Sequence, residues 1–528
     1  MDRRVTWVGT VLLLCFVLLF VQMNNLQVRD AKTLNANPLN FHTTPAPNPF
    51  FEARGEIISA DGVKLAYSRR THDEYKFLRV YPKRTARMFS DITGYYANAV
   101  AAFGFGVEAS YNKYLQEHPA PRGSLGALLG QHDETDNVYL TVSEKLQAVA
   151  MNALDASTAK DGGAIVVLDP RTGAVLAMYG YPNYDPNAFA VHSPAEVDRL
   201  ADRDLRRDYD PRVNYAISER EPPGSTMKVV TTSAVFDHDP QIEQQFFKPE
   251  SSITFPDSPG SLPLQNYGGE ACPVGGGYLA QILAYSCDTA YAQVGDELGY
   301  TALSEEAHAF GFCIGLAEAS DCQGPGDIPP IDLPYAVPSL LPPSSTIDGS
   351  NPYTGYSAIG QFDDGATVLE MALVASAIAD DGTIMAPHVV DRVVNPYGDT
   401  EFTYHPHVWR KATSPATAVA VRQLMTGVTL KPGATAAGLF ASWYAGGGPT
   451  IAAKTGTAEP GENTCGTENW LIALGPAAQG ETPTVAVAAM VPVSQAECTV
   501  YGYSPTGATV AGPVLLPVLK AALALQGS

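Results

Sequence analysis

The stretch 220–236 constrains the fold of this chain more than any other segment. It places Pro-Pro-Gly directly before Ser225 and continues through Lys228 into a mostly apolar run. Because helix starts tolerate proline and buried helices are apolar, the pattern predicts a buried helix that begins near Ser225. Positions i and i+3 share a helix face, which lets the Ser225 and Lys228 side chains meet.

This Ser-x-x-Lys pattern is compatible with nucleophilic catalysis. A serine hydroxyl is a weak nucleophile until a base lies within hydrogen-bond reach, and a desolvated lysine can be that base. Free backbone N–H groups in the first helical turn can stabilise an oxyanion. The alternative is a serine helix cap beside a surface lysine. The pattern arises by chance roughly once in a chain of this length, so further motifs must decide.

Two more segments supply such motifs. The segment 451–458 reads Ile-Ala-Ala-Lys-Thr-Gly-Thr-Ala, and the segment 284–291 carries Ser286 and Asp288. A Ser-x-x-Lys motif, a Ser-x-(Asn) motif and a Lys-Thr-Gly motif in this chain order form a known catalytic set. The candidate site residues are Ser225, Lys228, Ser286, Asp288, Lys454, Thr455, Gly456 and Thr457.

Composition and residue spacing argue against nucleic-acid binding and against a zinc site. The chain has 528 residues and a formal net charge of −22, which argues against nucleic acid as a partner. No cysteine or histidine spacing resembles a zinc site, so we expect neither a metal nor a cofactor. A length of this size fits two or three domains.

The N-terminus predicts a membrane anchor. Residues 5–21 are apolar and uncharged, and Arg3 and Arg4 precede them, which places the start inside and the remainder outside the cell. The alternative is a cleaved signal peptide, but no small-residue cleavage site follows the run. We therefore expect one N-terminal transmembrane helix and an extracellular catalytic domain.

Six cysteines follow the anchor, in what would be an oxidising compartment. They allow three disulfides, and pairing in sequence order is our prediction. The predicted pairs are Cys272–Cys287, Cys313–Cys322 and Cys465–Cys498. The first pair would tether the residue next to Ser286.

Periodicity and turn signals divide the chain further. We expect a tail and anchor at 1–23, a linker at 24–50, a non-catalytic domain at 51–139, and a catalytic domain at 140–528. The runs flanking the turn at 169–173 predict a hairpin of a central sheet. Later strands at 470–474 and 485–491 and helices at 367–379 and 514–525 predict an α/β (α+β sandwich) fold. In it, an antiparallel sheet is flanked by helices.

At this point the chain resembles the class B penicillin-binding proteins, most closely the PbpA-like group of actinobacteria. The resemblance covers nearly the whole chain, including Arg54-Gly, 163–178, the segment 223–228, Ser357-Ala-Ile-Gly-Gln361 and 454–459. It implies a penicillin-binding transpeptidase fold preceded by a smaller mixed pedestal (dimerisation-type) domain. It also implies a peptidoglycan D,D-transpeptidase that cross-links stem peptides ending in D-Ala-D-Ala and is covalently inhibited by β-lactams.

The resemblance also implies roles for the motif residues. Ser225 is similar to the acylated nucleophile, Lys228 to its general base, and Ser286 to a proton relay. Lys454 and the threonines of its motif would hold the terminal carboxylate of the donor, and the backbone N–H groups of Ser225 and Thr457 would form the oxyanion hole. The chemistry agrees, because a carboxylate needs cationic and hydroxyl donors.

Asp288 departs from the family pattern, which usually has asparagine there. An ionised aspartate only accepts hydrogen bonds, and a carboxylate beside Lys228 and Lys454 favours their charged forms. It could be neutralised by Lys454, be protonated, or slow or redirect the site. One alternative to a transpeptidase, suggested by Asp288, is a catalytically weakened penicillin-binding scaffold protein. The other is a serine β-lactamase, which shares the three motifs.

The family implies a partner too. An enzyme that cross-links but does not polymerise needs a polymerase, and these proteins pair with SEDS-type membrane glycosyltransferases of the RodA/FtsW kind. Residues 50–140 are too few for a glycosyltransferase domain of the chain's own. The anchor and these residues are the candidate contact surface.

Overall fold

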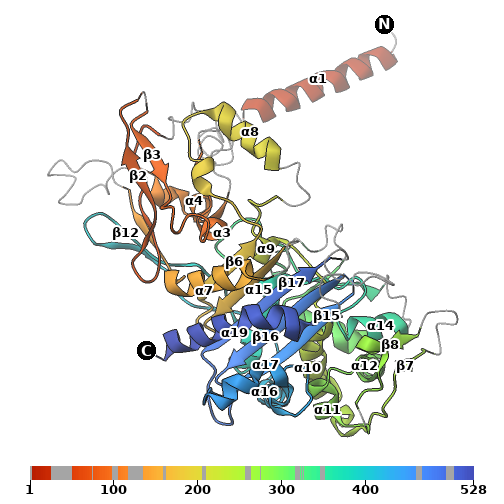
Figure 1. Ribbon diagram of the computed structural model, residues 1–528. Helices are drawn as coiled ribbons and strands as arrows, with labels where there is room; N and C mark the ends of the chain where they lie inside the picture. Colours follow the sequence, from red (N-terminus) through yellow and green to blue (C-terminus); the bar gives the residue numbers. More distant parts are fainter. Residues whose placement is uncertain are drawn as a thin grey trace.

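The computed structural model describes residues 3–24, 50–73, 75–97, 105–116, 135–157, 162–204, 210–255, 263–273, 275–315, 322, 324, 326–344, 351–459, 466–494 and 505–527. Figure 1 shows two main sheets: one formed mainly by strands of residues 57–140, and a second one packed between helices. The mixed α/β class predicted from the sequence is confirmed.

The first sheet has six strands. Their order is β13 (Thr400–Thr403), β12 (Val390–Val394), β4 (Asn137–Leu140), β1 (Ile57–Ile58), β2 (Lys64–Arg70) and β3 (Phe77–Val80). The β1–β2 hairpin lies where the Asp61-Gly62 turn predicts it, with Ile57 opposite Ala66. Because β12 and β13 come from residues 390–403, this sheet combines segments of both predicted domains.

Short helices pack on this sheet around a buried carboxylate. They are α3 (Ser90–Thr93), α4 (Gly106–Ser110) and α5 (Asn112–Leu115). Glu108 of α4 is fully buried and contacts Arg54 at 2.8 Å and Arg79 at 2.6 Å. Charges are buried only when they are paired, so this triad ties α4 to β3, which bears Arg79, and to the segment before β1, which bears Arg54.

The central sheet is antiparallel and has five strands. Their order is β15 (Ala452–Ala458), β16 (Thr467–Gly475), β17 (Val485–Val493), β5 (Gly163–Leu168) and β6 (Val175–Tyr181). Successive side chains of a strand point to opposite faces. In β16, Trp470 and Ile472 therefore join one hydrophobic core, while Leu471 and Ala473 join the other.

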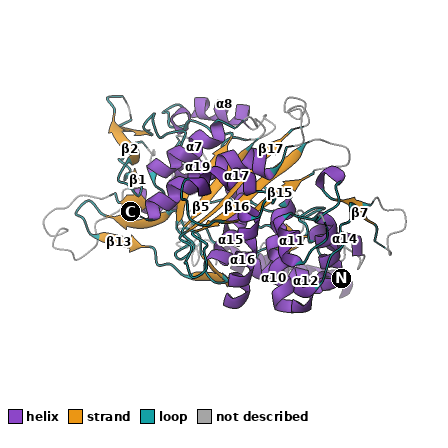
Figure 2. Ribbon diagram, turned by 60° about the horizontal axis from the view of Figure 1, so that its bottom comes forward, coloured by secondary structure: helices purple, strands orange, loops and turns teal. Residues whose placement is uncertain are grey.

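Helices cover both faces of this sheet (Figure 2). The helices α7 (Glu144–Asp155) and α19 (Gly507–Gln526) pack on one face, and α15 (Val368–Ala379) packs on the other. The α15 helix is buried throughout, and the Thr367 side chain caps its start by accepting from the Glu370 N–H. The 367–379 and 169–173 predictions thus correspond to α15 and to the β5–β6 hairpin.

The remaining elements surround these layers. The helices are α8 (Pro194–Asp204), α9 (Tyr215–Ser218), α10 (Lys228–His238), α11 (Leu279–Ala284), α12 (Asp288–Phe310), α14 (Asn351–Ser357), α16 (Pro415–Leu430) and α17 (Ala437–Ala445). The 3-10 turns are η2 (Pro186–Ala188), η3 (Gly224–Met227), η4 (Pro240–Gln244) and η5 (Tyr267–Gly269). Short strand pairs are β7 (Ser252–Ile253) with β8 (Leu264–Gln265), β9 (Cys313–Ile314) with β10 (Leu340–Leu341), and β11 (Thr383–Met385) with β14 (Val408–Lys411).

Two helices bear on the expected membrane anchor, and among the described residues only α19 meets the length and composition that a membrane span needs. By length and composition α19 could span a membrane, but it packs on the central sheet and buries Val514, Leu515 and Leu519 there, as a core helix does. The first helix, α1 (Arg3–Asn24), includes the predicted anchor run, and its Leu12–Phe20 side chains are exposed.

Candidate active site

The nucleophile candidate lies in a tight turn at one edge of the central sheet. Ser225 belongs to η3, and the α-helix itself begins at Lys228, three residues later than the sequence predicts. Gly224 has φ +52°, and a Cβ there would approach the Thr457 carbonyl to 3.0 Å. Glycine at this position therefore lets the turn lie directly against β15.

The middle motif joins two helices. Ser286 lies between α11 and α12 with φ +59°, and Asp288 is the first residue of α12. A positive φ is uncommon for a serine, and strained backbone of this kind clusters at functional sites. Cys287, which lies between Ser286 and Asp288, forms a disulfide with Cys272.

A continuous chain of contacts connects the three motifs. The Ser225 hydroxyl donates to Asp288 Oδ1 at 3.2 Å, and Lys228 Nζ donates to the same oxygen at 2.6 Å. Lys228 Nζ also lies 3.3 Å from Ser286 Oγ, which in turn lies 2.7 Å from Lys454 Nζ. Asp288 thus connects Ser225 to Lys228, and Ser286 connects the two lysines.

Burial controls the charge of both lysines. Lys228 is fully buried, and this desolvation lowers its pKa, although the Asp288 carboxylate acts in the opposite direction. Desolvation also holds the pKa of Lys454 well below its usual value, and the charge of Lys228 lowers it further. Two ammonium groups in one buried site repel each other at a high cost in free energy, so the pair favours a state in which one lysine is neutral.

The third motif occupies β15. Lys454 lies inside the strand and is fully buried, and the Thr455 hydroxyl donates to Thr435 Oγ1 at 2.8 Å. A Cβ on Gly456 would come within 2.8 Å of the Pro223 carbonyl, so glycine keeps β15 against the turn that carries Ser225. Thr457 accepts from the Gly507 N–H at 3.2 Å.

These motifs open into a cavity of about 590 Å³. Its lining includes Ser225, Ser286, Asp288, Thr455 and Thr457 from the three motifs. A cavity of this volume matches the size of ordinary small-molecule sites. The motif residues therefore face a space that a peptide end can enter, and Lys228 and Lys454 are buried beneath it.

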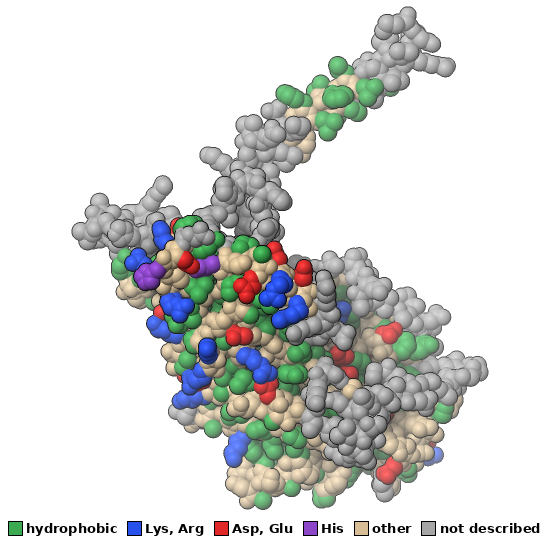
Figure 3. Space-filling view, turned by 45° about the horizontal axis from the view of Figure 1, so that its top comes forward, with side chains coloured by type: hydrophobic (Ala, Val, Ile, Leu, Met, Phe, Trp, Pro, Cys, Tyr) green, Lys and Arg blue, Asp and Glu red, His purple; other side chains and the backbone are tan. Residues whose placement is uncertain are grey.

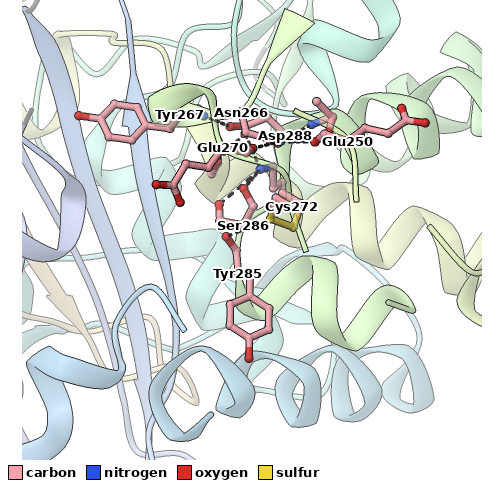
Figure 4. Close-up of a disulfide and its surroundings, with 12 residues drawn as sticks. Glu250, Asn266, Tyr267, Glu270, Cys272, Tyr285, Ser286 and Asp288 are labelled. Carbon is pink, nitrogen blue, oxygen red and sulfur yellow. Dashed lines mark hydrogen bonds and ion pairs between the residues drawn. A yellow bond between two sulfur atoms is a disulfide. The ribbon is translucent and has the colours of Figure 1, made fainter. Parts of the chain in front are cut away.

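Sequence reasoning missed one wall of this cavity, the segment 266–273 (Figure 4). Asn266 is buried there and accepts from the Thr289 N–H at 3.0 Å, while the Tyr267 N–H donates to Asp288 Oδ2 at 3.3 Å. The Tyr267 hydroxyl donates to the Pro505 carbonyl at 2.8 Å. Cys272 is the sequence feature that could have indicated this wall, because its predicted disulfide partner, Cys287, directly follows Ser286.

Among the described residues, two disulfides follow the predicted order. Cys272 is bonded to Cys287 beside the cavity, and Cys313 is bonded to Cys322 at the end of α12. The expected pair of Cys465 and Cys498 lies outside the described residues. Among the described residues, no group of three or more candidate ligands could hold a metal ion.

Two family models match the chain. The penicillin binding protein transpeptidase domain matches residues 163–520, which include all three motifs. The penicillin binding protein A dimerisation domain matches residues 54–124, within the region of the first sheet. Together they cover most of the chain.

Characterised relatives agree with these models. Peptidoglycan D,D-transpeptidase PbpA of Mycolicibacterium smegmatis is 33% identical over 99% of both chains, and that of Mycobacterium tuberculosis is 30% identical over 99% of both. The penicillin G acyl-enzyme complex of M. tuberculosis penicillin-binding protein A has a TM-score of 0.74 at 30% identity, covering 89% of this chain and all of that one. A D,D-transpeptidase domain from Eggerthella lenta has a TM-score of 0.70 at 29% identity, covering 90% of this chain and 99% of that one.

Proposed function

This chain belongs to the penicillin-binding transpeptidase family, and on that premise we propose that it is a peptidoglycan D,D-transpeptidase acting through an acyl-serine. The observation that carries the proposal is the connected set of Ser225, Lys228, Ser286 and Lys454 at one cavity. A nucleophile, a desolvated amine and a second buried amine are the groups that acyl transfer from a carboxylate-ended peptide requires.

In the acylation step, Ser225 Oγ bonds to the carbonyl carbon of the penultimate D-alanine. Lys228 in its neutral form takes the hydroxyl proton, and Ser286 passes a proton to the nitrogen of the terminal D-alanine as the C–N bond breaks. Lys454 in its charged form, with Thr455 and Thr457, holds the terminal carboxylate. The Ser225 and Thr457 N–H groups stabilise the oxyanion.

In the transfer step, an amine of a second stem peptide attacks the ester carbonyl. The uncharged amine nitrogen bonds to that carbon, the bond to Ser225 Oγ breaks, and one proton of the amine passes to Ser225 Oγ, so the new amide nitrogen keeps one proton. β-Lactams would stop at the ester, because their ring-opened product cannot leave.

The wider organisation is part of the proposal. Residues 51–139 would form a non-catalytic pedestal and residues 140–528 the transpeptidase domain, with strands 390–403 of the second completing the sheet of the first. The exposed apolar side chains of α1 support a single-pass anchor that leaves the catalytic domain outside the cell (Figure 3). A SEDS-type glycosyltransferase of the RodA/FtsW kind would be the membrane partner.

A D-alanine release assay tests the activity. The full-length chain is incubated with a synthetic stem peptide ending in D-Ala-D-Ala and an amine acceptor, and D-alanine and the cross-linked product are quantified. We expect both from the parent and neither from Ser225→Ala, with equal folding by circular dichroism. Activity that survives in Ser225→Ala contradicts the proposal.

Two outcomes identify the alternatives. Rapid hydrolysis of penicillin by the parent would indicate a serine β-lactamase, and an intact fold without acylation would indicate a scaffold protein weakened by Asp288. Co-purification of the full-length chain with its glycosyltransferase tests the partner separately. It should persist in Ser225→Ala, since that change leaves the surface unaltered, and its absence from the parent rules the partner out.

A further inference from the structure

The wall 266–273 carries a carboxylate that the acylation chemistry does not use. Glu270 lines the cavity together with Ser225 and Ser286, and its side chain is exposed. Its carboxylate forms no hydrogen bond or ion pair with the described residues. Figure 4 shows this side chain extending from the loop on the side away from the Cys272 disulfide. It is thus available to a ligand in the cleft.

The backbone around Glu270 is held from several sides. Its carbonyl accepts from Asn266 Nδ2 at 2.9 Å, and the same amide donates to the Glu250 carbonyl at 2.7 Å. Two residues later, Cys272 is bonded to Cys287, which directly follows Ser286. This anchoring fixes where the carboxylate enters the cleft, which a binding residue needs.

The two substrates of the proposed reaction differ in charge at their reacting ends. The donor ends in a carboxylate, and the buried lysines beneath the cavity suit that group. The acceptor presents a primary amine, which is an ammonium in neutral solution because an alkyl amine has a pKa near 10. Among the charged residues that line the cavity, Asp288 is paired with Lys228, which leaves Glu270 for a second cation.

We propose that the Glu270 carboxylate binds the ammonium of the acceptor stem peptide and so selects cationic amines for the transfer step. This inference rests on the proposed function. The ion pair forms before chemistry. The ammonium then loses one proton to solvent, its nitrogen bonds to the ester carbon, the bond to Ser225 Oγ breaks, and a second proton of the nitrogen passes to Ser225 Oγ. Glu270 acts by positioning the acceptor and by raising its local concentration.

The test measures acylation and transfer separately in the full-length protein. The donor is a D-Ala-D-Ala peptide whose side-chain amine is acetylated. The acceptors are a lysine-bearing peptide, which is cationic, and methoxyamine, which is neutral at pH 7. We expect Glu270→Gln to raise the KM for the lysine peptide about fivefold, the scale of a partly exposed ion pair. The KM for methoxyamine and the rate of penicillin acylation should change less than twofold.

A control variant and a charge-reversal variant test whether the effect is specific to the charge at position 270. Glu243→Gln removes an exposed carboxylate on η4, outside the cavity, and should leave every parameter unchanged. Glu270→Lys should raise the KM for the lysine peptide more than Glu270→Gln does, because the new ammonium repels the ammonium of the acceptor. Equal losses for both acceptors, or no loss for either, would each overturn the inference. A parent that fails to acylate defeats the proposed function instead.

Discussion

Asp288 Oδ1 lies 2.6 Å from Lys228 Nζ and also accepts the Ser225 hydroxyl at 3.2 Å. One carboxylate oxygen therefore lies between the nucleophile and its proposed base. Desolvation lowers the pKa of Lys228 toward the range of a useful base, whereas the carboxylate favours the charged amine. The geometry places these two effects in direct opposition.

Asp288→Asn should leave penicillin acylation equal or faster. Removing the charge lowers the pKa of Lys228 further, so a larger fraction is neutral at pH 7, and the acid limb of the rate–pH profile should move to lower pH. A shift of one pKa unit would give up to about tenfold faster acylation. Stopped-flow acylation between pH 5 and 9 checks this, with Glu243→Gln as control. A large loss of rate would instead show that the carboxylate is required.

The two disulfides should differ in their effect on acylation. Replacing Cys272 and Cys287 by serine opens a link that spans 15 residues, which should lower the free energy of unfolding by about 3 kcal/mol. It should also slow acylation, because the wall of the cavity loses its tether to Ser286. Urea unfolding and penicillin labelling measure the two effects.

The other disulfide is the matched comparison. Cys313 and Cys322 are 9 residues apart and lie outside the cavity lining. Their replacement by serine should lower stability while acylation of the folded protein stays within twofold. Equal slowing in both double variants would mean that the tether beside Ser286 has no special role.

Glu370 should make stability depend on pH. It is fully buried in α15, both carboxylate oxygens lack partners among the described residues, and burial raises its pKa to about 8. Because its pKa is higher in the folded chain, its contribution is fully present below about pH 4.3 and is lost as pH rises to 8. Glu370→Gln should therefore flatten the fall in Tm between pH 5 and 8.5, relative to the parent and to the exposed Glu305→Gln. An unchanged slope would refute this.

Much of the candidate site could be predicted from sequence because its residues lie in short motifs. The spacing of Ser225 and Lys228 and the Lys-Thr-Gly run are local patterns, which can be recognised in one sequence without knowledge of the fold. Asn266, Tyr267 and Glu270 could not be found this way, because they reach the cavity through a loop anchored by contacts to Thr289, Pro505 and Cys287. Such contacts join distant segments and leave no periodic signal.

In the fold, too, local features could be predicted from the sequence, whereas contacts between distant segments could not. The hairpin at 169–173 and the α15 helix were predictable, because apolar runs joined by a turn and a long apolar helical run are local signals. The addition of β12 and β13 to the first sheet was not, because residue pairs such as Val393 and Val138 lie far apart in the chain. The start of regular α-helix at Lys228 was misplaced because packing of Gly224 against β15, a tertiary contact, imposes the 3-10 turn.

Penicillin labelling of the full-length protein, followed over time beside Ser225→Ala, tests the central claim most directly. Fluorescent penicillin should label the parent alone, the label should map to the peptide that carries Ser225, and it should persist for many minutes. Label that forms and vanishes quickly, that appears equally on Ser225→Ala, or that never forms on the folded parent would contradict the account.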